Sequence, residues 1–253
     1  MKTLTDEHGF AREELVICTK GGYLPFDGSP PRNMREYVTE TFVKPGIASF
    51  DDIVGGMHCM TPAYLQNQLD QSLRNMEVGS VDVYYIHNPE SQLGHVSDAE
   101  FYSRLKLAFE RLEQNRSAGK LMYYGVATWN GFRVPAESRE HHSLAWMIDA
   151  ARAVGGDDHG FRFIQLPFNL AMPEAITLTN ETLDGERITV VEAAKRLGVT
   201  VVASASLLQG RIDPKTAIQF VHSTPGITTA LIGMSHVEHV EENLSNPGGD
   251  FQD

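Results

Sequence analysis

The chain has 253 residues, a formal net charge of −12 at pH 7 and an isoelectric point near 5.3. This length suits one large α/β domain, and the acidic balance argues against a nucleic-acid or anionic-membrane surface, because both need clustered lysine and arginine. The chain has only two cysteines, lacks an apolar run of membrane-spanning length and begins without the residue order of a signal peptide, so we expect a cytoplasmic protein with no disulfide framework.

The amino-terminal part predicts one strand followed by a long loop. Residues 15–20, which read LVICTK, form a short apolar run that ends at Lys20, and this pattern predicts a buried strand. Residues 21–60 are punctuated by glycine and proline, with a short helix expected over 33–43. A connection of this length is typical of a lid or a binding loop.

The next two elements lead to a histidine at a strand end. Pro62 stands at the first position of a predicted helix whose apolar residues repeat at helical spacing up to Met76. Residues 81–90, which read VDVYYIHNPE, then predict a buried parallel strand that ends at His87. Side chains at the carboxyl ends of barrel strands face the active-site mouth, so Lys20 and His87 are candidate functional residues. The alternative for His87 is a buried ring bonded to a backbone carbonyl.

The rest of the chain alternates helices and strands. Helices are expected over 98–118, 143–154 and 189–197, from 213 and after 235, with strands over 121–128, 161–168, 199–206 and 228–234. Asn180-Glu181-Thr182 matches a glycosylation acceptor, but without a secretory signal it is most simply a polar loop. The tail from Ser245 is expected to be frayed.

This alternation predicts an α/β fold, as one domain over residues 1–253, with a parallel sheet and helices outside it. Six strands are expected, whereas a closed barrel of this class needs eight. Two apolar sheet edges would then be uncovered, so we expect a homo-oligomer or a partner chain at those edges. A doubly wound sheet is disfavoured because the Gly21-Gly22-Tyr23 turn is not a glycine-rich phosphate fingerprint.

With Lys20 and His87 at strand ends, the sequence resembles the aldo-keto reductase family from about residue 12 to 244. The matching pieces are LVICTK at 15–20, VDVYYIHNPE at 81–90, SAGK at 117–120, YYGVATWN at 123–130, the strand with Gln165, ASASLLQG at 203–210 and LIGMSHVEHVEENL at 231–244. Their common order and spacing are hard to obtain by chance. The resemblance implies a TIM-barrel-like fold with about six of its eight strands. It also implies that the protein binds NADP(H) and reduces a small aldehyde or ketone to an alcohol, or runs the reverse reaction.

The resemblance also assigns catalytic roles. Members of the family use a tyrosine as proton donor, a lysine paired with an aspartate that lowers the tyrosine pKa, and a histidine that orients the carbonyl. Lys20 matches the lysine and His87 the histidine, but the motif that carries the aspartate and tyrosine has no counterpart. This gap and the two missing strands together predict that an amino-terminal portion is absent. Tyr23 is the best internal substitute, against the alternative of a loop tyrosine that packs its ring.

The implied cofactor contacts carry over unevenly. Gln165 matches the side chain that binds the nicotinamide carboxamide, and Thr128 or Asn130 replaces the usual Ser-Asn pair. Ser204 stands where many members stack a tyrosine on the ring. The other implied contacts, from the strand-end loop to the last helix, are Leu207, Gly210, Ser235, His239, Glu242 and Asn243.

The cofactor form and the catalytic competence both stay open at this point. The expected 2′-phosphate site has no lysine or arginine, so NADP(H) rests on family habit and NAD(H) is not excluded. For Glu242 and Asn243 the alternative is a solvated helix end. The rival function is a non-catalytic cofactor-binding or subunit-interaction protein, or one part of a split barrel. No metal site is expected, and His236 with His239 is interpreted as a surface pair.

Overall fold

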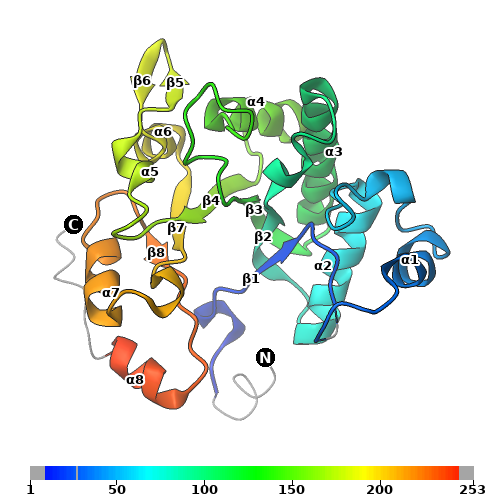
Figure 1. Ribbon diagram of the computed structural model, residues 1–253, viewed down its shortest axis with the longest axis horizontal. Helices are drawn as coiled ribbons and strands as arrows, with labels where there is room; N and C mark the ends of the chain where they lie inside the picture. The colour runs from blue at the N-terminus through cyan, green and yellow to red at the C-terminus, as the bar shows by residue number, and fades with distance from the viewer. Residues whose placement is uncertain (1–8, 27, 245–253) are drawn as a thin grey trace. The chain divides into compact units, whose positions relative to one another are not determined.

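The computed structural model describes residues 9–26 and 28–244 (Figure 1). The expected fraying after Ser245 lies outside the described residues. The chain divides into two compact units, the first with the residues up to Ala127 and Asp149–Phe161, the second with Thr128–Ile148 and the residues from Arg162. Each unit contributes three parallel strands, so the predicted α/β class with six parallel strands is confirmed. One barrel domain over 1–253 stays a prediction.

The first unit is built on β1 (Cys18–Gly21), β2 (Val81–His87) and β3 (Leu121–Ala127), with β2 in the middle. Helix α2 (Pro62–Met76) precedes β2, and α3 (Asp98–Ser117) connects β2 to β3. Proline opens α2 as predicted, and Ser97 caps α3 by accepting a hydrogen bond from the backbone of Glu100. Behind the sheet, the buried rings of Phe109, Tyr124 and Phe161 pack together.

The segment over residues 21–60 is folded, although its composition suggests an irregular loop. Helix α1 (Met34–Val38) continues as a π-helical turn (Thr39–Val43). A small apolar core consists of Leu24, Val38, Phe42, Ala48, Cys59 and, from α2, Tyr64. The two ends of the segment meet where Tyr23 and His58 form an antiparallel bridge. Whether the segment acts as a lid stays a prediction.

The second unit has the strand order β4 (Phe161–Pro167), β7 (Thr200–Ser204) and β8 (Thr229–Ala230). Helix α6 (Val190–Leu197) connects β4 to β7 along the chain. Thr189 caps it by accepting a hydrogen bond from the backbone N–H of Glu192, and the predicted glycine stop at Gly198 is present. The return bond from Glu192 that a full capping box needs stays a prediction. Helices α7 (Pro214–His222) and α8 (Val237–Leu244) follow, while α4 (Leu144–Gly155) has residues in both units.

Two predictions for the second unit need correction. The strand expected over 228–234 is only two residues long, since one further bond, from Leu231 to the Ala203 carbonyl, ends the ladder. The polar loop expected at residues 180–182 instead leads into a hairpin of β5 (Glu181–Leu183) and β6 (Glu186–Ile188), which follows the short helix α5 (Glu174–Thr177). Asp184-Gly185 forms its turn with positive φ at both positions, which is a recognised hairpin signal.

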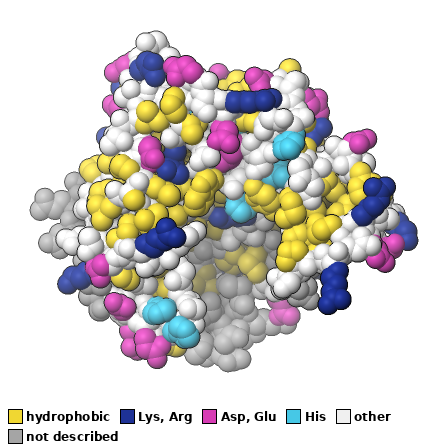
Figure 2. Space-filling model, in the orientation of Figure 1, with side chains coloured by type: hydrophobic (Ala, Val, Ile, Leu, Met, Phe, Trp, Pro, Cys, Tyr) yellow, Lys and Arg dark blue, Asp and Glu magenta, His cyan; other side chains and the backbone are white. Residues whose placement is uncertain are grey.

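The distribution of basic side chains and the apolarity of the helices can be compared with what the composition predicts. Lysine and arginine side chains are scattered over the face drawn in Figure 2, and the described residues on that face form no basic stripe. Among the described residues, no helix combines the length and apolarity needed to cross a membrane.

Candidate active site

In the first unit, Lys20 and His87 lie on the same face of the sheet. Lys20 is paired with Tyr85 in parallel register, and His87 stands two residues further along β2, so all three side chains point to one side. The opposite face is covered by α2, because Tyr84 donates a hydrogen bond to the Leu65 carbonyl. Lys20 and His87 are both half-buried, on the face turned away from α2.

Burial and mutual charge determine the protonation of this pair. Burial, then the charge of Lys20 and of His58, lowers the pKa of the His87 ring from 6.5 to about 4, and Glu90 opposes the shift. Burial also lowers the pKa of Lys20. The His87 ring is therefore neutral at pH 7 and offers one N–H donor.

Tyr23 lies directly against His87. The two rings meet edge to face, with centroids 5.1 Å apart and an interplanar angle of 77°. The Tyr23 hydroxyl is 2.6 Å from Ser91 Oγ, and the Tyr64 hydroxyl donates to the Tyr23 carbonyl at 2.8 Å. The structure thus brings a phenol to a strand end that also holds a neutral imidazole and, on the adjacent strand, an amine.

The described residues provide no replacement for the aspartate that accompanies the family lysine. Among the described residues, no carboxylate forms an ion pair or hydrogen bond with Lys20, and Asp82 of β2 is paired with Arg12 at 2.9 Å instead. The other side chain on the Lys20 face of β1 is Cys18, which is exposed. That exposure corrects the expectation of a buried strand, since β2 is the one described strand beside β1.

Sequence reasoning missed two buried residues beside His87. The ring of His58 is 1% exposed, with Nε2 at 2.8 Å from the His87 carbonyl, and it packs edge to face on Tyr23. Gln92 is fully buried, with Nε2 at 3.2 Å from His58 Nδ1. Neither residue belongs to a motif, and the glycines around residue 58 predicted only a loop.

In the second unit, two predicted cofactor residues occupy the ends of neighbouring elements. The backbone N–H of Thr128 donates to the Gln165 carbonyl at 2.8 Å, and their side chains are 3% and 4% exposed. Thr128 Oγ1 and Gln165 Oε1 are buried without a hydrogen-bond partner among the described residues. Asn130 instead donates to Glu140 at 2.8 Å, which leaves Thr128 as the better replacement for the Ser-Asn pair.

A cavity of about 530 Å³ in the same unit collects most of the other predicted cofactor residues. Its walls include Leu207, Gly210, Ser235, His239, Glu242 and Asn243. Ser206 also lines it and has a buried Oγ without a hydrogen-bond partner in the described part of the chain. Ser204 lies just before this wall, where its carbonyl accepts a hydrogen bond from Phe168.

The backbone of this wall is unusual. Ala205, Leu208 and Gln209 have positive φ, as does Gly210 at 79°. Non-glycine residues rarely adopt this conformation, and such positions concentrate at ligand sites. The described residues that line the cavity include no lysine or arginine, as expected from the sequence.

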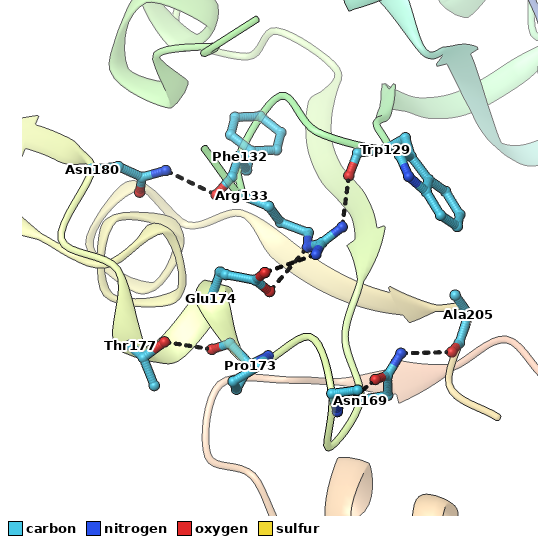
Figure 3. A network of polar contacts seen from close by, with 10 residues as sticks. Trp129, Phe132, Arg133, Asn169, Pro173, Glu174, Thr177, Asn180 and Ala205 are labelled. Carbon is cyan, nitrogen blue, oxygen red and sulfur yellow. Dashed lines mark hydrogen bonds and ion pairs between the residues drawn. The ribbon is translucent and has the colours of Figure 1, made fainter. Parts of the chain in front are cut away.

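A polar network holds the loops around these residues, and it too was missed (Figure 3). The Arg133 guanidinium donates to both carboxylate oxygens of Glu174, at 2.9 and 3.2 Å, and to the Trp129 carbonyl at 3.2 Å. Asn169 donates to the Ala205 carbonyl at 2.9 Å and so fixes the start of the cavity wall. These partners are 36 and 41 residues apart, which no local pattern reveals.

Asn180 belongs to the same network, and its prediction as part of a polar loop was wrong. The residue is 2% exposed, and its amide donates to the Phe132 and Val134 carbonyls at 2.9 Å each. These carbonyls would otherwise be unpaired, so the buried amide stabilises the loop after β3.

The residues present fit a nicotinamide nucleotide. An unpaired amide oxygen and hydroxyl can bind a carboxamide, and the cavity offers an unpaired hydroxyl with further polar groups for the rest of the molecule. The fit lacks a cation for a 2′-phosphate.

Comparisons with known proteins identify the family and the fold. A model of the aldo/keto reductase family matches residues 2–150, more than half of the chain. Among solved structures, an aldo-keto reductase from Bacillus halodurans in its holo form is 14% identical with a TM-score of 0.58. A thermostable aldo-keto reductase in complex with the inhibitor epalrestat is 16% identical with a TM-score of 0.52. No curated protein sequence matches the chain.

The extent of these matches differs. The match with the Bacillus halodurans protein covers 97% of this chain and 71% of that protein. The match with the thermostable protein covers 77% of this chain and 64% of that protein. Identities this low show a shared fold, and the fold is that of aldo-keto reductases. Together with the family match over residues 2–150, this shows that the chain belongs to the aldo/keto reductase family.

Proposed function

We propose that this protein reduces an aldehyde or ketone to an alcohol with a nicotinamide nucleotide. The observation that carries the proposal is the neutral His87 ring on the same sheet face as Lys20, with the Tyr23 ring packed against it. Such a set can orient a carbonyl oxygen and stabilise negative charge that develops on it.

Each of these residues has a distinct role. When bound, a nicotinamide nucleotide would supply the hydride for the carbonyl carbon. His87 donates its ring N–H to the carbonyl oxygen, which orients the substrate and stabilises the developing alkoxide. Tyr23 releases its phenol proton to that oxygen, and Lys20 stabilises the phenolate until solvent returns a proton. This use of Tyr23 requires its hydroxyl to leave Ser91 Oγ.

The nucleotide is assigned to the second unit. We propose that Gln165 and Thr128 bind the carboxamide, since their buried oxygen atoms have no partner among the described residues. Residues that line the cavity, with Glu242 and Asn243 near one end of the chain, would hold the remaining part. NADP(H) is the proposed form by family habit, and His239 and Ser235 are the polar groups available for a 2′-phosphate.

A second candidate is a protein that binds the nucleotide without turnover. Two observations favour it: no carboxylate in the described part of the chain pairs with Lys20, and the Tyr23 hydroxyl already has a partner in Ser91. Loss of the general acid alone typically costs a factor of about 10² to 10⁴.

One experiment separates the two candidates. The purified protein is titrated with NADPH and NADH by nucleotide fluorescence, then mixed with a panel of aldehydes and ketones. Turnover above buffer that falls about 10²-fold or more in Tyr23→Phe supports the enzyme. Ser91→Ala is the matched control, because it frees the Tyr23 hydroxyl and keeps turnover. Binding without turnover supports the second candidate, and absence of binding contradicts both.

We also propose a cytoplasmic location and self-association. Both cysteines are free, and an exposed thiol such as Cys18 suits a reducing compartment. Among the described residues β1 has a single neighbouring strand, so its outer edge is open for pairing with a second copy. Sedimentation at micromolar concentration tests this, and a stable monomer would contradict self-association.

A further inference from the structure

We propose that His58 is a positioning residue whose bond to the His87 carbonyl holds the carboxyl end of β2, and with it the His87 ring against Tyr23. Its expected effect on turnover depends on the proposed function, whereas its effect on the geometry does not. The residue comes from the long segment over 21–60 rather than from a strand of the sheet.

The contacts of His58 form a continuous buried chain. His58 Nε2 lies 2.8 Å from the His87 carbonyl, and Nδ1 lies 3.2 Å from Gln92 Nε2. Arg104 on α3 donates to Gln92 Oε1 at 3.3 Å. His58 is 1% exposed and Gln92 is fully buried, so each of these bonds matters for stability.

Only one proton arrangement satisfies the whole chain. A carbonyl can only accept, so His58 Nε2 carries the hydrogen. In a neutral ring Nδ1 is then the acceptor, and Gln92 must present its amide N–H to it. The Gln92 oxygen consequently faces Arg104, which only donates. Burial lowers the pKa of His58 and favours this neutral form, although the bond to His87 and the charge of Glu90 oppose the shift.

The location of His58 connects both candidate strand ends. Its ring packs edge to face on Tyr23, with centroids 5.1 Å apart at 87°. Gly22, just after β1, lies so close that an added Cβ would be 2.9 Å from both His58 Nε2 and the His87 carbonyl. A side chain at position 22 would therefore clash with both groups. The turn after Lys20 packs directly against the His58 ring and the backbone of His87.

Two substitutions separate the contacts that His58 makes. His58→Gln can keep an N–H donor for the His87 carbonyl and loses the ring. His58→Phe keeps a ring against Tyr23 and loses the donor. Phe109→Leu is the control, because it weakens the same unit at the buried contact with Tyr124 and Phe161, away from this cluster.

The readouts are taken on the full chain at pH 7. Ring ¹⁵N NMR reports the tautomer of His58, and a nuclear Overhauser effect reports the contact between Tyr23 and His87. Steady-state kinetics separate kcat from KM, and fluorescence gives the Kd of NADPH.

We expect a neutral Nε2–H tautomer for His58 in the wild-type chain. His58→Phe should lose the Tyr23–His87 contact and about tenfold or more in kcat, with Kd unchanged. His58→Gln should keep the contact and stay within about threefold of wild-type kcat.

Three results would overturn the inference: an Nδ1–H tautomer, retention of the contact in His58→Phe, or an equal loss in Phe109→Leu. If the wild-type chain turns over no carbonyl, the proposed function fails, and the NMR results alone decide the role of His58.

Discussion

The two units differ in how their polar groups are satisfied. In the first unit several side chains around the strand ends already have a polar partner, as Tyr23 with Ser91 and His58 with Gln92 show. In the second, buried oxygen atoms of Thr128, Gln165 and Ser206 have no partner among the described residues. An unsatisfied buried group costs about 1–3 kcal/mol, so such groups usually await a ligand or water. This contrast is the one that the proposed function requires, with chemistry assigned to the first unit and nucleotide binding to the second.

The two units also differ in the direction in which burial shifts the pKa of an ionisable side chain. Burial keeps His87 neutral in the first unit. In the second, burial raises the pKa of Glu181 to about 7, although the backbone N–H of Leu144 donates to its carboxylate and opposes this. The two units should consequently respond to pH in opposite directions.

The largest expected effect tests the division between chemistry and binding. Lys20→Met should lower kcat for carbonyl reduction by about 10²–10³-fold, because the charge that stabilises the phenolate is lost. The Kd of NADPH should stay unchanged, as measured by fluorescence. Lys44→Met, at an exposed ion pair with Glu40, is the matched control and should leave both constants unchanged. An equal loss in kcat and nucleotide affinity would break the division.

Acidification should destabilise the first unit. His87 has a folded pKa of about 4 against an ordinary 6.5, so between these values unfolding takes up a proton. The free energy of unfolding should fall by about 1–2 kcal/mol from pH 6.5 to 4, after a discount for solvent at a half-buried ring. Urea unfolding of the wild-type chain and of His87→Asn measures the difference.

The second unit should show the opposite slope. Glu181 has a folded pKa of about 7 against an ordinary 4.5, so the folded state holds a proton that the unfolded state releases as pH rises through this window. Glu181→Gln removes this titration and should flatten the loss of stability between pH 4.5 and 7. If the wild-type and Glu181→Gln curves stay parallel, Glu181 does not titrate as proposed.

The smallest expected effect concerns the side-chain amide oxygen of Gln165, which has no hydrogen-bond partner among the described residues. Gln165→Leu should weaken NADPH binding by about fivefold to tenfold through one lost hydrogen bond, with kcat at saturating nucleotide nearly unchanged. Gln219→Leu, on the exposed side of α7, is the control. A larger loss of kcat than of NADPH affinity would assign Gln165 to the chemical step. Such a result would contradict the assignment of chemistry to the first unit alone.

Local patterns in the sequence predicted much of the fold. Proline at the start of α2, the Thr189 cap of α6 and the buried run of β2 each depend on neighbours within a few residues. The hairpin of β5 and β6 was missed although Asp184-Gly185 signals a turn, because its strands are only three residues long.

The candidate site was predicted in part. The sequence by itself determined that Lys20 and His87 lie at the carboxyl ends of strands, since the apolar runs before them and the breaks after them are local features. That these two strands are neighbours came from the structure. The sequence also indicated Gln165 and several of the residues that line the cavity, through the family resemblance.

Only the tertiary structure decided how these residues are held. The bonds of His58 to His87, Arg133 to Glu174 and Asn169 to Ala205 join residues 29 to 41 positions apart. A polar side chain carries no periodic signal that tells which distant carbonyl it will meet, because the match is made when separate elements pack and bury both groups.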